Sequence, residues 1–249
     1  MTTLARARVR FAGGMTTLAS ARVRRAREMA TLAAARRHRT GRRVPRYRHT
    51  TRTYRFLKRL TDVLLCLIAL PLFLPIGVLC AVAIWLDSPG PILLRQQRTG
   101  LHGSRFPMYK FRTMVRNAEE LKPTLAHLNI LPPPDFKIPD DPRITRVGRV
   151  LRKTSLDELP QLINVLRGQM SLVGPRPTSF ASSTYRIWHM ERLEVRPGIT
   201  GIWQVRARGS ATFDERLRMD IEYIDAMSPL LDLRIIGLTV LSMIKRSGV

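Results

Sequence analysis

Cysteine is scarce in this chain of 249 residues, which contains only Cys66 and Cys80. Both lie inside one long apolar stretch, so neither a disulfide framework nor a pair of metal-ligating thiols is expected. This cysteine usage is compatible with a reducing compartment.

Acidic residues are almost absent from the first 59 positions, which hold 18 of the 43 Lys and Arg residues and one acid, Glu28. The net charge of +25 is therefore concentrated at the start of the chain. A basic segment of this kind suits nucleic acid or an anionic membrane surface. Because the chain lacks zinc-finger spacing and the aromatic pattern of an RNA-binding motif, nucleic acid is not expected as its partner.

The basic segment is repetitive. Three copies of a 14-residue unit begin at Met1, Met15 and Met29. The unit is too short and polar to bury a core, and three copies do not make a solenoid. Residues 1–53 are therefore predicted to be a disordered tail and linker, with a transient basic helix on an anionic surface as the alternative.

Charge is missing altogether from residues 63–86, a run of 24 residues. As a helix this run would be about 36 Å long, more than the roughly 30 Å of a hydrocarbon core. Residues 54–87 are therefore expected to form a membrane helix. Pro71 and Pro75 each lack an N–H group, and they predict a sharp bend within it.

The flanking charges bear on how this segment enters the membrane. Eight Lys or Arg residues lie within positions 40–59 and three within positions 88–107. Basic flanks favour the cytoplasmic side, so a re-entrant helix-turn-helix satisfies both ends. A straight crossing would export one basic flank, and it remains the alternative.

Residues 88–249 are expected to form a cytoplasmic domain of the α+β class, mostly helical with little strand. Apolar residues recur at helical spacing in residues 143–154 and 213–227, which predicts surface-lying amphipathic helices. The apolar residues 230–249 are expected to form an interfacial or core helix, and residues 203–209 a short strand or loop.

Two adjacent acids, Asp157 and Glu158, stand out in this domain. Ser155 and Glu158 have the spacing of a capping box, and Pro160 is tolerated only near a helix start, which places both acids in the first turn of a helix. First-turn acids are common for structural reasons alone. The same geometry also suits chemistry, because one carboxylate can attack phosphorus while its neighbour holds Mg²⁺.

Basic residues near these acids are candidates for binding phosphate groups. Arg152 directly precedes the acids, and Arg176 and Arg196 lie on stiff loops beside Pro and Gly. Lys110 and Arg112 belong to a second basic cluster, which could instead hold lipid headgroups at the membrane.

The order of motifs resembles a known family. KRLTDVLLCLIALPLFLPIGVL, SPGPILLRQQRTG, FPMYKFRTM, DPRITRVGRVLRKTSLDELPQLINVLRGQMSLVGPRP and VRPGITGIWQV follow one another over residues 58–205, with DIEYI and IKRSGV after them. Over residues 55–249 the chain is similar to the bacterial sugar transferases, the monotopic polyprenyl-phosphate phosphoglycosyl transferases. The resemblance is to the small form, with one membrane hairpin.

The resemblance implies a reaction for the catalytic domain, residues 88–249. A UDP-sugar binds with Mg²⁺, Asp157 attacks the β-phosphorus and releases UMP, and undecaprenyl phosphate then takes up the sugar phosphate. Glu158 assists with the metal or with positioning, and Arg152 and Arg176 match phosphate-handling positions. The reaction starts exopolysaccharide or other lipid-linked glycan synthesis on the cytoplasmic face of the bacterial inner membrane.

Two positions depart from the family pattern. Leu74 stands where a serine often precedes the kink proline, Pro75, and Gln204 and Arg206 belong to a WQVRARG loop that usually carries small or polar residues. The loop is expected near the nucleotide or sugar, so the sugar cannot be transferred from the family. The oligomeric state also stays open, and a basic nucleic-acid- or membrane-binding scaffold without catalysis is the alternative function.

Overall fold

The computed structural model describes residues 51–131, 135–181, 184–207 and 212–245. The chain divides into two units, Met1–Arg46 and Tyr47–Val249, and every described residue belongs to the second. The repeats predicted to form a basic tail lie outside the described residues.

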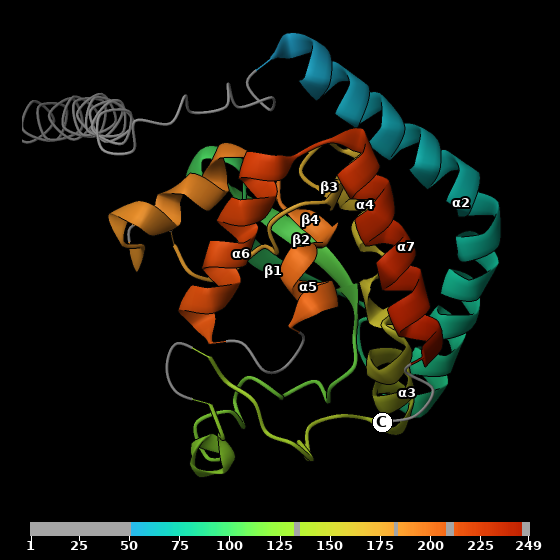
Figure 1. Cartoon of the computed structure of the whole chain (residues 1–249). Coiled ribbons are helices and arrows are strands. Elements are labelled where there is room, and N and C mark those ends of the chain that lie inside the picture. Colours follow the sequence, from blue (N-terminus) through green and yellow to red (C-terminus); the bar gives the residue numbers. More distant parts are fainter. Residues whose placement is uncertain (1–50, 132–134, 182–183, 208–211, 246–249) are drawn as a thin grey trace, which may run out of the picture. The chain divides into compact units, whose positions relative to one another are not determined.

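The membrane segment is one long helix, α2, which spans Arg52–Asp87 and starts two residues earlier than expected. The side chain of Thr51 caps its first turn by accepting a hydrogen bond from the Tyr54 N–H. Pro71 and Pro75 both lie inside α2, and the helix curves along the body without a break (Figure 1). The expected helix-turn-helix is therefore replaced by one continuous, curved helix.

Contacts at both ends fix α2 to the same body. Near its start, Asp62 Oδ1 accepts a hydrogen bond of 3.1 Å from the Leu172 N–H. At its end, Asp87 Oδ2 accepts one of 3.0 Å from the Val147 N–H. Between these points α2 is largely exposed: only 11% of its most apolar window is buried. This exposure fits a membrane segment and not the core helix of a soluble domain.

Among the described residues, strand is limited to two pairs, in line with the little strand that was expected. Strand β1 (Leu93–Thr99) runs antiparallel to β2 (Arg105–Phe111), with Leu94 opposite Lys110. Strand β3 (Ser171–Val173) is parallel to β4 (Gly198–Thr200).

Helices make up most of the remaining regular structure. They are α3 (Arg146–Thr154), α4 (Gln161–Leu166), α5 (Ile202–Arg206), α6 (Phe213–Ala226) and α7 (Pro229–Lys245), with short 3-10 segments at Leu101–Gly103, Ala126–Leu128, Leu156–Glu158 and Ile187–Glu194. The helices expected in residues 143–154, 213–227 and 230–249 are confirmed within the described part. The strand or loop expected from residue 203 is wrong, because α5 occupies it and packs on α6 and α7.

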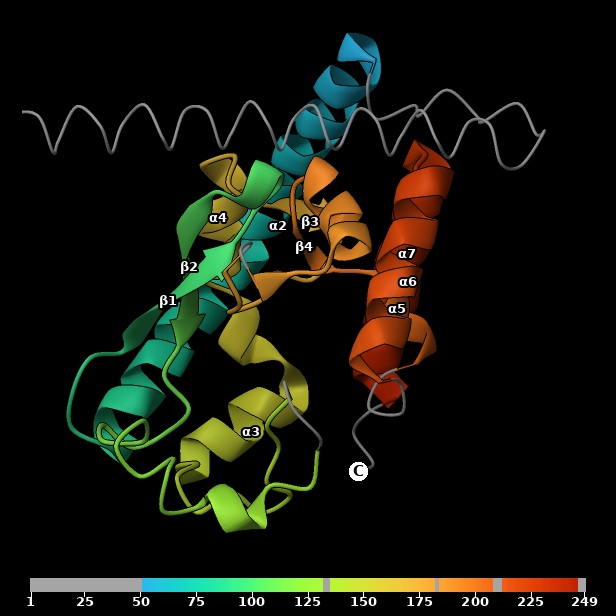
Figure 2. The same ribbon diagram turned by 90° about the vertical axis from the view of Figure 1, so that its left-hand side faces the viewer.

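The body is arranged around the short β3–β4 pair. The β1–β2 hairpin and α4 lie to one side of it, and α6 and α7 lie to the other (Figure 2). One apolar cluster contains Val173, Tyr223 and Ile235, and a second joins Cys66 of α2 to Met108 and Val165. These clusters tie the membrane helix, both strand pairs and the terminal helices into one unit.

Candidate active site

The two acids are presented by a tight turn between α3 and α4. Helix α3 ends at Ser155, whose backbone adopts the left-handed conformation with φ 60°. A 3-10 turn, Leu156–Glu158, follows, and Pro160 precedes α4. The capping box predicted for Ser155 and Glu158 is wrong, because the acids precede α4 and do not lie in its first turn. A serine in this conformation is strained by about 1 kcal/mol.

Side-chain spacing in this turn separates apolar from acidic residues. Residues three apart lie on the same face of a 3-10 turn, so Leu156 and Leu159 share one face. Both pack against a cluster that includes Ile84 of α2 and Phe111 of β2. The two acids therefore lie on a different face of the turn from these leucines.

Lys110 contacts both acids. It lies on β2, and its Nζ is 3.0 Å from Glu158 Oε1 and 3.6 Å from Asp157 Oδ2. All three side chains are mostly buried, with exposed fractions of 17% for Lys110 and 14% for each acid. Lys110 thus lies beside both acids, and its predicted role in phosphate binding stays a prediction.

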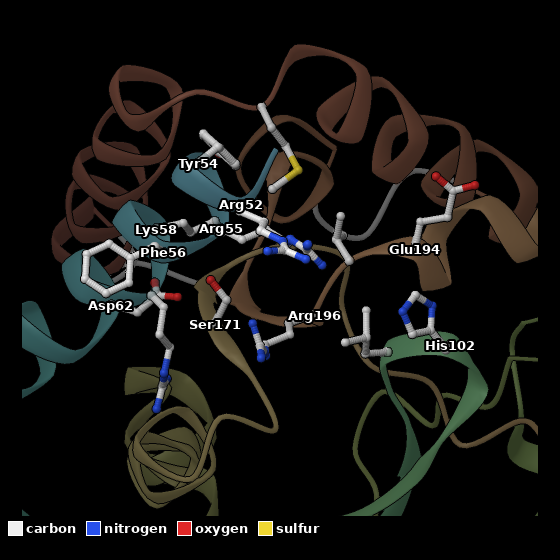
Figure 3. Close-up of a pocket in the computed structure, with 14 residues that line it drawn as sticks. Arg52, Tyr54, Arg55, Phe56, Lys58, Asp62, His102, Ser171, Glu194 and Arg196 are labelled. Atoms are coloured by element: carbon white, nitrogen blue, oxygen red, sulfur yellow. The ribbon is translucent and has the colours of Figure 1, made fainter. Parts of the chain in front are cut away.

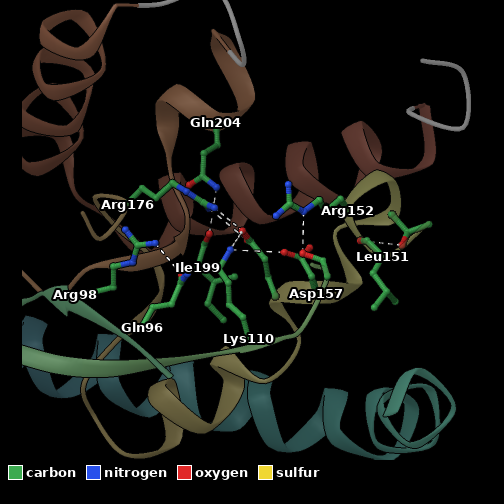
Figure 4. Close-up of polar contacts among 12 residues, drawn as sticks. Gln96, Arg98, Lys110, Leu151, Arg152, Asp157, Arg176, Ile199 and Gln204 are labelled. Carbon is green, nitrogen blue, oxygen red and sulfur yellow. Dashed lines mark hydrogen bonds and ion pairs between the residues drawn. The ribbon is translucent and has the colours of Figure 1, made fainter. Parts of the chain in front are cut away.

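Arg176 binds Glu158 from a third segment, the loop that follows β3. Its Nη1 is 3.3 Å from Glu158 Oε2, and its Nη2 bonds to Glu158 Oε1. A two-point contact of this kind fixes the direction of both groups. Figure 4 shows Arg176, Lys110 and Arg152 approaching the acids from separate parts of the chain.

A buried ion pair holds the backbone of Arg176. Arg192 Nη2 donates to Arg176 O at 2.5 Å and to Asp220 Oδ2 at 2.6 Å. The Arg176 backbone amide also lies close enough to Asp220 to stabilise its ionised form. The side chains of Arg192 and Asp220 are only 4% and 2% exposed. The ion pair of Arg192 and Asp220 therefore holds the loop that carries Arg176 in place.

Close backbone packing also fixes the loop. A side chain at Gly174 would place its Cβ 2.6 Å from Arg196 O, and one at Gly198 would come within 2.1 Å of Gly174 N. Both distances are shorter than van der Waals contact, so only glycine fits. The two motifs VGPRP and VRPGITG therefore meet backbone to backbone.

Arg152 approaches Asp157 without bonding to it. Its Nε donates to Thr113 Oγ1 at 2.8 Å, and its positive charge lowers the pKa of Asp157. Burial lowers the pKa of Arg152 itself. The guanidinium is held by Thr113 in a position from which it stabilises negative charge near Asp157.

The two acids differ in electrostatic environment. Burial, followed by repulsion from Glu158, raises the pKa of Asp157 above its ordinary value, although Lys110 opposes this. Burial would also raise the pKa of Glu158, but Arg176 and Lys110 together bring it far below its ordinary value. Glu158 is thus a firmly ionised carboxylate with cationic partners, and Asp157 is the more basic of the two. Carboxyl pairs with separated pKa values are typical of catalytic sites.

An apolar cavity of about 380 Å³ reaches Glu158 from the side of α2 and α7. Its walls include Ala69 and Phe73 of α2 and Val240 of α7, and its polar lining includes Glu158 and Gln204. The cavity thus connects the apolar helices α2 and α7 with the site.

Of the two residues predicted for the nucleotide or sugar loop, only one lies at the site. Gln204 is buried, its Nε2 donates to Ile199 O at 3.2 Å, and it faces the cavity beside Arg176 (Figure 4). Arg206 instead forms an exposed ion pair of 2.9 Å with Glu222.

Two further basic residues do not reach the acids. Arg112 donates to Pro89 O at 3.0 Å and to Ser88 O at 2.6 Å, so it secures the chain where α2 ends. Arg196 donates through Nε to Gly168 O at 2.8 Å and lines a different cavity.

Several supporting residues escaped prediction from sequence. Thr113, Arg192 and Asp220 act through hydrogen bonds to other site residues, and such roles leave no local sequence pattern. The motifs FPMYKFRTM, which contains Thr113, and DIEYI, which contains Asp220, were the available signals.

The carboxylates of the site could hold Mg²⁺ only together with ligands from the substrate or water. No group of three or more His, Cys, Asp or Glu side chains gathers around one point in the described part of the chain. Mg²⁺ is commonly held by one or two carboxylates together with substrate phosphates and water. Asp157 offers such a carboxylate, whereas both oxygens of Glu158 are already bound by cations.

Comparison with known proteins shows which family the chain is similar to. Residues 53–246 match the family described as bacterial sugar transferase. The chain is 43% identical over 202 residues to the undecaprenyl-phosphate galactose phosphotransferase of Salmonella typhimurium, covering 79% of this chain and 42% of that protein.

Two other relatives are more similar in length. The UDP-glucose:undecaprenyl-phosphate glucose-1-phosphate transferase of Caulobacter vibrioides is 44% identical over 196 residues, which is 75% of this chain and 69% of that protein. The exopolysaccharide production protein ExoY of Rhizobium meliloti is 38% identical over 192 residues, which is 74% of this chain and 83% of that protein. The chain thus spans less than half of some curated relatives and most of others.

Proposed function

Because the chain belongs to the bacterial sugar transferase family, we propose that it transfers a sugar 1-phosphate from a UDP-sugar to undecaprenyl phosphate and releases UMP. The names of the relatives pair undecaprenyl phosphate with galactose or glucose. They therefore support the reaction and leave the sugar open. The name of ExoY supports a place in exopolysaccharide production, and the long apolar helix α2 supports a place at the bacterial cytoplasmic membrane.

The mechanism that we propose rests on a difference between the partners of the two acids. Glu158 is bound by Arg176 and Lys110, so both of its oxygens already contact a cation. Within the described residues Asp157 has one ion pair, with Lys110 at 3.6 Å, and Arg152 and Arg176 act on it at longer range. Its carboxylate is therefore available to bond to phosphorus. We assign Asp157 as the nucleophile and Glu158 as the group that holds the cations in place.

In the first step, an Asp157 oxygen attacks the β-phosphorus of the UDP-sugar. The bond between this phosphorus and the bridging oxygen breaks, and the electron pair leaves with UMP. In the second step, a phosphate oxygen of the lipid attacks the same phosphorus, and the aspartyl–phosphorus bond breaks to restore the carboxylate. Lys110, Arg152 and Arg176 stabilise negative charge on the phosphoryl oxygens.

Mg²⁺ is the expected cofactor. When bound, it supplies positive charge to the diphosphate, which speeds departure of UMP. Asp157 and the substrate phosphates would hold it, and Glu158 would join them only on releasing a cation.

The apolar cavity supplies a route for the lipid. A polyprenyl chain is apolar along its length, and the cavity walls come from the helices α2 and α7. A chain lying there would bring its phosphate toward Glu158 and its cations.

Re-entry of α2 into the membrane is part of the same proposal. Since both ends of α2 are bonded to one body, a domain on the cytoplasmic face keeps both ends on that face. The curved middle of the helix, around Pro71 and Pro75, would then dip into the bilayer.

Release of UMP tests the function. Purified full-length protein in detergent is incubated with Mg²⁺ and each of a panel of UDP-sugars, without lipid acceptor. We expect one or more UDP-sugars to yield about one UMP per protein, with a mass increase of one sugar phosphate that hydroxylamine removes. Asp157→Asn should abolish both signals, whereas Asp140→Asn, a matched change at an exposed acid, should preserve them. Retention of UMP release in Asp157→Asn would exclude the assigned nucleophile.

A further inference from the structure

A second cavity, of about 770 Å³, opens at the start of α2 (Figure 3). Its walls come from the first turns of α2, the 3-10 turn Leu101–Gly103 and residues 194–196 ahead of β4. It shares no lining residue with the apolar cavity that reaches Glu158. It is therefore distinct from the proposed active site.

Positive charge dominates this second cavity. Five Arg or Lys side chains and one His line it, against the two carboxylates of Asp62 and Glu194; the basic residues are Arg52, Arg55, Lys58, Arg59, His102 and Arg196. The side chains of Arg52, Arg55 and Arg196 reach into its interior (Figure 3).

Part of this charge is already neutralised or used by the fold. Lys58 forms an ion pair of 2.7 Å with Asp232. Arg59 donates to the carbonyl oxygens of Val165 and Leu166, at 2.5 and 2.8 Å, which fixes its position but does not cancel its charge.

The other guanidinium groups have N–H donors that no described residue uses. Arg196 uses Nε for Gly168 O, and its two terminal nitrogens have no bond to any of the described residues. The side chains of Arg52 and Arg55 likewise have no hydrogen-bond or ion-pair partner in the described part of the chain. Burial and the neighbouring charges of Arg59 and Arg55 lower the pKa of Arg196, and only Asp62 opposes them. An anion in the cavity would relieve this repulsion.

We propose that this cavity is a binding site for a phosphate-bearing anion, and that its ligand is the headgroup of an anionic phospholipid. Guanidinium groups bind phosphate through paired, charge-assisted hydrogen bonds. Basic pockets beside membrane helices on the cytoplasmic side are suited to anionic headgroups.

The position of the cavity favours a lipid over a soluble anion. The uncharged part of α2 begins at residue 63, directly after the turns that line the cavity. Phe56, which also lines it, is 67% exposed, and Leu60 on the next turn is 43% exposed. A lipid with its phosphate among Arg52, Arg55 and Arg196 would lay its acyl chains along these apolar side chains. Such a site would anchor the point at which α2 enters the membrane.

Ligand-induced thermal stabilisation tests this site without any sugar nucleotide, so its outcome is independent of the proposed transferase reaction. Full-length protein in detergent is titrated with dihexanoylphosphatidylglycerol, with dihexanoylphosphatidylcholine or with inorganic phosphate, and the dissociation constant is obtained from the rise in unfolding midpoint. Each variant is referenced to its own unliganded midpoint, so a change in basal stability does not affect the comparison.

We expect phosphatidylglycerol to raise the midpoint and phosphatidylcholine to have little effect. Arg55→Gln and Arg196→Gln should each weaken phosphatidylglycerol binding about tenfold or more, since each removes a charge-assisted contact. Arg149→Gln, at an exposed arginine on α3, should bind within about twofold of wild type. Inorganic phosphate binding as tightly as phosphatidylglycerol would overturn the lipid assignment in favour of a soluble anion. Unchanged affinity in both Arg55→Gln and Arg196→Gln would overturn the site.

Discussion

The buried pair formed by Arg192 and Asp220 makes a quantitative prediction about how the Arg176 loop is held. Arg192→Met removes bonds of 2.6 Å to Asp220 and 2.5 Å to Arg176 O, and it leaves a carboxylate that is 2% exposed without its cation. Breaking a buried pair in this way costs about 3–5 kcal/mol. The matched control is Arg206→Met, because the pair of Arg206 with Glu222 has a similar length, 2.9 Å, but is more than half exposed. That change should cost less than about 1 kcal/mol.

The pair should also show strong coupling. Asp220→Asn leaves a neutral side chain beside Arg192, and combining it with Arg192→Met removes the unpaired charge. We therefore expect the double variant to be less destabilised than the sum of the single variants by about 2 kcal/mol.

The free energy of unfolding of the four variants is measured in detergent at pH 7. The rate of UMP release is measured as well, because it depends on the position of the Arg176 loop. Burial raises the pKa of Asp220 to about 6, even though Arg192 lowers it. Loss of Arg192 should therefore be most harmful above that pH and less harmful below it, where Asp220 gains a proton. The reasoning is refuted if Arg192→Met is no more destabilised than Arg206→Met, or if the two single effects simply add.

Two other predictions concern the acids and the apolar cavity. Because the pKa of Asp157 is raised and that of Glu158 is lowered, Asp157→Asn should raise the unfolding midpoint at pH 7, whereas Glu158→Gln should destabilise the protein by about 2–4 kcal/mol. The gain in stability from Asp157→Asn should vanish as the pH falls and wild-type Asp157 takes up its proton. The loss of stability from Glu158→Gln should shrink as the pH falls below about 4.5, the ordinary pKa of Glu. If both substitutions stabilised the protein at pH 7, or both destabilised it, the assigned roles of the two acids would be contradicted. In the apolar cavity, Ala69→Trp should retain the single-turnover release of UMP but slow transfer to the polyprenyl phosphate about tenfold or more, since the indole fills much of a 380 Å³ space. Val82→Trp, on an exposed part of the same helix, is its control, and equal transfer rates in the two variants would exclude the cavity as the lipid route.

Local sequence patterns predicted several elements well because their causes lie within a few residues. Helices α3 and α6 follow from apolar residues at helical spacing, α7 follows from its apolar composition, and α2 follows from a long uncharged run. The acids at 157 and 158 were identifiable for the same reason, since they are adjacent in sequence.

Errors arose where neighbouring elements overrode the local pattern. Ser155 and Glu158 have capping-box spacing, yet the left-handed backbone of Ser155 ends α3 and starts a separate 3-10 turn. A turn was expected at Pro71 and Pro75, but α2 accommodates both prolines in a continuous curve. In the first case, Leu156 and Leu159 pack against the body and stabilise the separate turn. In the second, hydrogen bonds accepted by Asp62 and Asp87 hold both ends of α2 to the body.

The sequence alone determined the membrane segment, the adjacent carboxylates and the supply of basic residues around them, because each depends on residue type and short-range spacing. Only the tertiary structure decided which cations meet the acids. Lys110 and Arg176 reach them, whereas Arg112 turns to Ser88 and Arg196 to a separate cavity. The reason is that these contacts join segments 18 to 48 residues apart, and their geometry depends on how β2, the Arg176 loop and the 3-10 turn pack together.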